Sequence, residues 1–306
     1  MIQTQVALMR RELWEHRSIF VVPGVVALFV MLSSLLGQVT ISDLEHVDLG
    51  IIGATNMPEN ARGVLINLVL FTISNFFGIA MWFLMVFYTL DSLYAERKDR
   101  SILFWRSIPV TDFETVLSKL LTAIVVIPLV TFAIVIATHL VVLGSLSVWV
   151  GDRGGSPVNL IWSAAPLMDA WSATFVMALA VPLWLSPFVG WFLFVSAFTK
   201  RSPLLVAALP IFLLPLFEQI FFRSSLFADA FFVRTVKMPL FAGVERLKEL
   251  AGEGAELEQL VDAELSLLSL IDVGGFLADP QLWIGIVVCG LFTTAAIYVR
   301  RYRDES

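Results

Sequence analysis

Hydrophobic residues fall into six runs along the chain, each long enough to cross a membrane. The runs cover residues 19–37, 64–90, 120–144, 171–198, 203–222 and 281–299. A bilayer core about 30 Å thick requires roughly 20 apolar residues per helix, because only a helix pairs its own backbone amides and carbonyls within lipid. The pattern predicts an all-α integral membrane protein with six transmembrane helices, folded as one transmembrane domain over residues 1–306.

The fourth and fifth runs contain proline pairs, Pro182 with Pro187 and Pro210 with Pro215. Each proline removes a backbone hydrogen bond and permits a kink. Polar residues also interrupt the fifth run near its end, at Glu218 and Gln219. An ionisable side chain at membrane depth usually faces a cavity or a partner; the alternative is an interfacial carboxylate at the outer end of a tilted helix. The candidate residues of a translocation pathway are Glu218, Gln219, Pro210 and Pro215.

The composition agrees with the hydropathy pattern. Hydrophobic residues make up 58% of the chain, charged residues make up 15%, and the mean hydropathy is +0.86, which excludes an ordinary soluble domain. The single cysteine, Cys289, lies within the last run, so neither a disulfide framework nor a cysteine metal site is expected.

Charges flank the apolar runs unevenly. Most of the 20 Lys and Arg residues lie in short flanks on one side, which by the positive-inside rule is cytoplasmic and holds both termini. The net charge of −6 arises because acidic residues gather in the predicted outer loops. No nucleic-acid partner is implied.

The segment before the first run, residues 1–18, has helical periodicity. Ile2, Val6, Met9 and Leu13 recur at steps of three and four, while charged residues lie mostly on other faces. This pattern predicts an amphipathic N-terminal helix in the inner membrane interface. The alternative is a solvated helical extension that ends in orienting arginines.

Residues 91–119 form the one substantial cytoplasmic loop and are expected to make a helical hairpin. The helix of the second run continues outward, Pro109 breaks it, and a new helix starts at Thr111, with Glu114 three residues later as in a capping box.

This loop resembles that of ABC-2 type permeases, the membrane subunits of ATP-binding cassette transporters. About 35 residues carry the resemblance: Asp91 at the end of the second run, the pair Glu96-Arg97, the turn Pro109-Val110-Thr111, and Lys119 before the third run. The remainder of the chain matches by architecture. The outer loop before the last run is longer here than in compact members of that family.

The resemblance implies that the loop is a coupling helix that sits in a groove of a separate ATP-binding subunit. Aromatic residues would anchor the contact within a polar rim that includes Glu96 and Arg97. The alternative is a loop that only sets topology, with its aromatics on the membrane surface. The residues expected to couple to the ATP-binding subunit are Asp91, Glu96, Arg97, Phe104, Trp105, Pro109 and Lys119.

Catalytic motifs are absent from the sequence. No Gly-Lys dipeptide occurs, so there is no phosphate-binding P-loop, and His16, His46 and His139 are widely separated with no HExxH motif. We therefore expect no enzymatic activity, cofactor or metal in this chain. ATP and Mg²⁺ would be bound by the partner subunit.

The outer loop, residues 223–280, divides into an aromatic half and an acidic half. The aromatic half is expected to re-enter the outer leaflet, and the acidic half, with apolar residues at helical spacing from Val244 to Leu268, to form a helix over the exit. The alternative is a helix that lies on the membrane surface with no part in transport.

The expected function is that of a permease subunit of an ATP-driven exporter in the bacterial cytoplasmic membrane. It would act as a dimer, either with itself or with a related permease, surrounded by lipid and bound to the ATP-binding subunits. The alternatives are an ion- or proton-coupled secondary transporter that uses Glu218 and a non-transporting membrane anchor or assembly protein.

Overall fold

The structure, a computed structural model, describes residues 2–42, 53, 55–99, 110–241 and 266–302. The described part is helical throughout. Its main α-helices are α1 (Ile2–Glu15), α2 (Ser18–Ser42), α4 (Glu59–Lys98), α6 (Asp112–Leu121), α7 (Ile127–Gly151), α8 (Leu167–Trp184), α9 (Ser186–Phe198), α10 (Pro203–Phe222), α11 (Leu226–Val236), α14 (Val273–Ala278) and α15 (Pro280–Tyr302). Short π-helical and 3₁₀ turns link them at Thr122–Val126, Val158–Trp162, Pro239–Phe241 and Leu268–Leu270.

Six helices in the described residues are long and apolar enough to span a membrane. They are Ser18–Gln38, Glu59–Lys98, Asp112–Gly151, Leu167–Trp184, Pro203–Phe222 and Pro280–Tyr302. Each matches one predicted run, so the number of apolar helices and the all-helical class are confirmed. The chain is a multi-pass membrane protein.

The second and third apolar helices are far longer than a bilayer requires. Each contains 40 residues, or about 60 Å at 1.5 Å per residue. In the third, a π-helical turn at Thr122–Val126 joins α6 to α7 without ending the helix. Pro128 follows that turn in the first turn of α7, and its missing N–H removes one regular backbone bond there. These two helices therefore extend past the apolar core at one or both ends.

The fourth run, expected as one helix that its prolines could kink, is divided into two helices. α8 ends at Trp184, one residue separates it from α9, and Pro182 and Pro187 flank the break. Beyond the break, α9 packs closely along α15. A Cβ atom added at Gly190 would lie 2.9 Å from the Cα of Cys289, so only glycine permits this approach.

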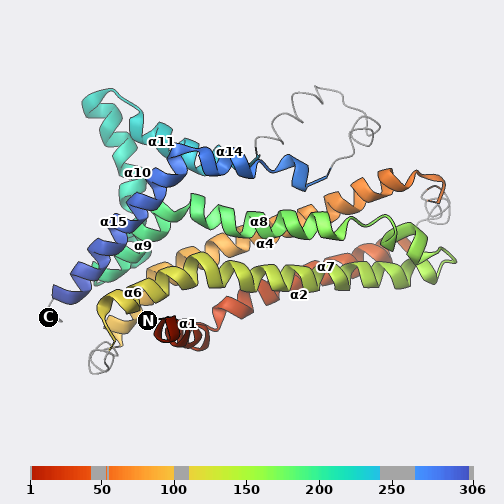
Figure 1. Cartoon of the computed structure of the whole chain (residues 1–306), viewed down its shortest axis with the longest axis horizontal. Coiled ribbons are helices and arrows are strands. Elements are labelled where there is room, and N and C mark those ends of the chain that lie inside the picture. The colour runs from red at the N-terminus through yellow and green to blue at the C-terminus, as the bar shows by residue number, and fades with distance from the viewer. Residues whose placement is uncertain (1, 43–52, 54, 100–109, 242–265, 303–306) are drawn as a thin grey trace.

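α10 lies at the periphery of the bundle. Only 6% of its apolar window is buried, and Figure 1 shows it diverging from the long helices α4 and α7. Pro210 and Pro215 lie inside α10 without ending it. Large apolar side chains such as Phe212 and Ile220 are exposed, as expected of a helix that contacts lipid or another subunit.

The two termini lie at the same end of the bundle (Figure 1). α1 lies at this end and packs against α6. Its Leu8 is buried against the bundle, while Val6 and Trp14 are exposed. The helix itself is present as predicted, and its contact with a lipid surface stays a prediction. Most of the predicted acidic helix, Val244 to Leu268, falls within residues 242–265, outside the described residues; Leu268 begins a 3₁₀ turn, Leu268–Leu270.

Candidate functional site

A buried group of charged side chains joins four helices at the end of the bundle that holds the termini. Its centre is the ammonium group of Lys119 in α6, whose residue is 0% exposed. Lys119 Nζ lies 2.8 Å from Oε1 of Glu12 in α1 and 3.0 Å from Oε1 of Glu96 in α4. One cation therefore bridges two buried carboxylates from helices that are distant in sequence.

Arg300 extends this cluster to the last helix. Its Nη1 donates to Oε2 of Glu96 at 2.5 Å, and its Nε donates to Oδ1 of Asp112 at 2.9 Å. Arg11 of α1 reaches the other oxygen of Glu96 at 3.4 Å. We call Glu12, Glu96, Lys119, Arg300, Asp112 and Arg11 the inner ion cluster; it contains three acids and three bases.

Aromatic side chains close one side of the inner ion cluster. The hydroxyl of Tyr88 donates to Oε2 of Glu12 at 2.8 Å, and the ring of His16 lies edge-on to Tyr88. Burial lowers the pKa of His16 below its usual value, so the imidazole is neutral at pH 7. Its Nε2 approaches Oε2 of Glu12 to 3.6 Å as a neutral contact.

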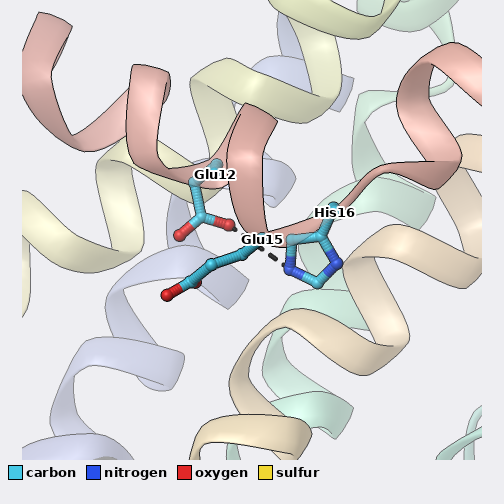
Figure 2. Close-up of side chains that lie close together, drawn as sticks. All are labelled: Glu12, Glu15 and His16. Carbon is cyan, nitrogen blue, oxygen red and sulfur yellow. Dashed lines mark ion pairs between the residues drawn. The ribbon is translucent and has the colours of Figure 1, made fainter.

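Glu12, Glu15 and His16 have potential metal-ligating atoms close together. Figure 2 shows the Glu12 carboxylate and the His16 ring facing each other, while the carboxylate of Glu15 points away from the ring. Arg11 holds Glu15 with bonds of 2.8 and 2.9 Å, and Glu12 already accepts bonds from Lys119 and Tyr88. These carboxylates are therefore committed to the ion pairs.

The physical role of the cluster follows from its burial. Removing charged groups from water costs several kcal/mol per ion unless close partners compensate, and breaking such a pair by deleting one partner costs about 3–5 kcal/mol. The pairs connect α1, α4, α6 and α15, and the 100–109 segment joins α4 to α6. The cluster therefore fixes both ends of that segment to the first and last helices.

Arg97 provides a further attachment. Its Nη2 donates to the backbone carbonyl oxygen of Ser196, in the last turn of α9. The same nitrogen donates to the carbonyl oxygen of Thr199, just after that helix, at 2.8 Å. The hydroxyl of Ser196 accepts bonds from the backbone amides of Leu93 and Tyr94 in α4. The end of α4 is thus bonded directly to the end of α9.

The coupling residues expected from the sequence lie in two different environments. Glu96 and Lys119 are internal, at 5% and 0% exposure, rather than part of an exposed polar rim. Arg97 is half-buried against α9, and Asp91 is exposed. The capping box at the start of α6 is present, because Thr111 accepts from the amide of Glu114 while the Glu114 carboxylate accepts from that of Thr111. Phe104, Trp105 and Pro109 lie outside the described residues.

The four residues expected on a translocation pathway all lie on α10, the peripheral helix, and their part in transport stays a prediction. Glu218 accepts a hydrogen bond from the Ser224 hydroxyl at 2.5 Å and another from the backbone amide of Phe227 at 2.9 Å. Its carboxylate thus holds the turn into α11. Gln219 is exposed, and Pro210 and Pro215 are half-buried on the peripheral helix.

The far end of the bundle has polar attachments of its own. Asp169 at the start of α8 accepts from Asn67 of α4 at 3.1 Å, from the Ser266 hydroxyl, and from the backbone amide of Leu267 at 2.8 Å. Arg234 of α11 stacks on Trp184, with its guanidinium carbon 4.2 Å from the ring centre. These contacts attach α11 and the segment that begins at Ser266 to the membrane helices; re-entry of α11 into the outer leaflet stays a prediction.

Sequence reasoning did not identify the inner ion cluster. By the positive-inside rule, Arg11 and Arg300 count only as orienting charges in the flanks of the apolar runs, and Glu12 counts only as one of the charged residues of the amphipathic segment 1–18. One signal was available, because Glu12 lies one turn from Leu8 on α1 and so shares its buried face. Comparisons of the chain with protein families, with curated proteins and with solved structures find no match.

Proposed function

We propose that this chain is the membrane-spanning permease subunit of an ATP-driven exporter of the ABC-2 type. It forms the translocation pathway as a dimer in the bacterial cytoplasmic membrane, with both termini in the cytoplasm. A separate subunit binds and hydrolyses ATP with Mg²⁺. The loop between α4 and α6 is its docking element.

The observation that carries this proposal is how firmly the ends of that loop are held. A loop that only sets topology needs exposed positive charge, and its flanks need no rigid connection to other helices. Here Glu96 and Lys119 on either side of the loop share the inner ion cluster with Arg300 of α15. Motion applied at the loop would therefore reach α1, α4, α6 and α15 together, as coupling to an ATP-driven subunit requires.

The secondary-transporter alternative has weaker support. A coupling carboxylate must exchange its proton or ion with a pathway, whereas Glu218 is engaged in the turn between α10 and α11 through Ser224 and Phe227. A membrane anchor has no need to hold both ends of this loop rigidly, so the anchor alternative does not explain why the inner ion cluster lies beside the loop. A Glu218→Gln variant distinguishes the two hypotheses. It should retain transport activity if the chain is an ATP-driven permease, and lose it if Glu218 is the coupling carboxylate of a secondary transporter.

The test is to express the chain with the P-loop protein encoded beside it and to measure co-purification and ATPase activity. We expect the two proteins to co-purify from membranes. The Arg97→Gln variant removes the guanidinium bonds from α4 to the end of α9 but leaves the inner ion cluster intact. It should still bind the ATPase, while transport per ATP hydrolysed falls.

Lys98→Gln is the matched control, since Lys98 is the next residue, carries the same charge and is exposed. It should behave as the wild type in binding and coupling. The proposal is wrong if no P-loop protein associates with the wild-type chain. Equal effects of the two variants would show that the attachment of α4 to α9 has no part in coupling.

A further inference from the structure

A cavity of about 300 Å³ lies between α4, α7 and α8. Most of its wall is apolar, including Phe77, Met81, Trp82, Phe132, Val135 and Met177. Its lining positions 74–82 on α4 and 131–135 on α7 lie near the middle of the second and third apolar runs. The cavity is therefore at the depth of the bilayer core, and molecules dissolved in lipid are its natural source of ligands.

One buried hydroxyl on the cavity wall lacks a hydrogen-bond partner. Thr131 is 4% exposed, and its Oγ1 has no partner among the described residues. A threonine within a helix usually bonds the carbonyl four residues earlier. Many threonines of these helices do so, namely Thr72, Thr89, Thr122, Thr138, Thr174 and Thr293. Thr131 departs from that pattern, and it is one of the residues that line the cavity.

A second polar group lies on the same wall, where α4 meets α8. The hydroxyls of Ser74 and Thr174 are 3.0 Å apart, and Thr174 donates its proton to the carbonyl of Ala170 at 2.7 Å. Ser74 must then donate to Thr174, which leaves lone pairs on the Ser74 oxygen able to accept a bond. Thr131 thus supplies a donor and Ser74 an acceptor on this wall, and none of the described residues that line the cavity is charged.

We propose that this cavity binds a neutral lipophilic molecule that carries one hydrogen-bonding oxygen, such as a hydroxyl or carbonyl group. The apolar wall accommodates the hydrocarbon part, and Thr131 bonds the oxygen. A charged ligand is disfavoured because nothing in the lining would compensate for its loss of water. The volume is at the lower end of the range for small-molecule sites, so the ligand is small. This inference does not depend on the transport proposal.

Gly78 makes the cavity testable. It lines the cavity, and a Cβ atom added there would meet no atom within 4 Å. The backbone at this position therefore accepts a side chain, and Gly78→Leu should reduce the volume of the cavity. Gly290 in α15 is the matched control, because a Cβ atom there also meets nothing and the position is outside the cavity.

The experiment uses the purified full chain in lipid nanodiscs and two photoreactive probes, a diazirine derivative of decanol and the matching derivative of decane. We expect the decanol probe to label peptides of α4, α7 or α8 that line the cavity. Gly78→Leu should abolish this labelling, and Gly290→Leu should leave it unchanged. Thr131→Val should weaken binding of the decanol probe about five-fold, as expected for the loss of one hydrogen bond. Binding of the decane probe should be unchanged.

Two results would overturn the inference. The first is undiminished labelling in Gly78→Leu, which would place the probes on the outer surface of the bundle. The second is a Thr131→Val protein that binds decanol as tightly as the wild type, or that loses both probes equally. Because Thr131→Val changes one hydroxyl to a methyl group, it tests the site even if the larger substitution at Gly78 disturbs folding.

Discussion

Replacement of Lys119 by methionine is the sharpest test of the inner ion cluster. Methionine retains the length and apolar character of the lysine stem and removes the charge. The ammonium group lies 2.8 Å from Glu12 and 3.0 Å from Glu96, and Lys119 is fully buried. Its removal leaves two buried carboxylates without their shared cation.

The two carboxylates are not equally affected. Glu96 keeps Arg300 at 2.5 Å and Arg11 at 3.4 Å. Among the described residues, Glu12 keeps the Tyr88 hydroxyl and the neutral ring of His16. The cost should therefore arise mainly at Glu12, and it should be about 3–5 kcal/mol in the free energy of unfolding, the usual cost of leaving a buried charge unpaired.

The thermal midpoint of the detergent-solubilised protein should fall by about 5–10 °C in Lys119→Met. Glu12→Gln added to this variant should restore about half of the loss, because it removes the carboxylate that is left unpaired. Lys98→Met is the control and should change the midpoint by less than about 1 °C, since surface charges contribute little. Equal midpoints for Lys119→Met and Lys98→Met would refute the buried cluster.

Three further predictions concern packing, pH and topology. Gly190→Ala should cost about 1–3 kcal/mol, because its Cβ would meet the Cα of Cys289 at 2.9 Å, whereas Gly290→Ala should be neutral or slightly stabilising in the same unfolding assay. Because burial lowers the pKa of His16, the neutral ring favours the folded state; its stabilisation should persist above about pH 6.5 and be lost below it, and His16→Gln should lack this dependence. In a Cys289→Ala background, an impermeant thiol reagent should label cysteines from the cytoplasm at positions 101 and 202, and from outside at positions 42, 156 and 255.

Hydropathy predicted much of the fold, because each membrane helix satisfies its backbone locally and its apolar length is visible in the sequence. Pro182 and Pro187 predicted a kink in the fourth run, where the structure has a break at Leu185, and the capping box at Thr111 is confirmed. These features depend on residues that are near one another in the chain.

The inner ion cluster could not be predicted in this way. Glu12 is 107 residues from Lys119, and Glu96 is 204 residues from Arg300. A basic residue that flanks a membrane run satisfies the positive-inside rule whether it faces water or a buried carboxylate. Only the packing of α1, α4, α6 and α15 separates Arg300, which is buried, from Arg301, which is exposed.

Photo-crosslinking from the loop between α4 and α6 is the most direct test of the proposed coupling. A photoreactive phenylalanine analogue would replace Phe104, and the same analogue at the exposed Phe212 of α10 would serve as the control. After irradiation in native membranes, the crosslinked proteins would be identified by mass spectrometry. We predict that position 104 captures a protein with a P-loop and that position 212 does not. Failure to capture any P-loop protein from position 104 would contradict the assignment of this chain as the permease of an ATP-driven exporter.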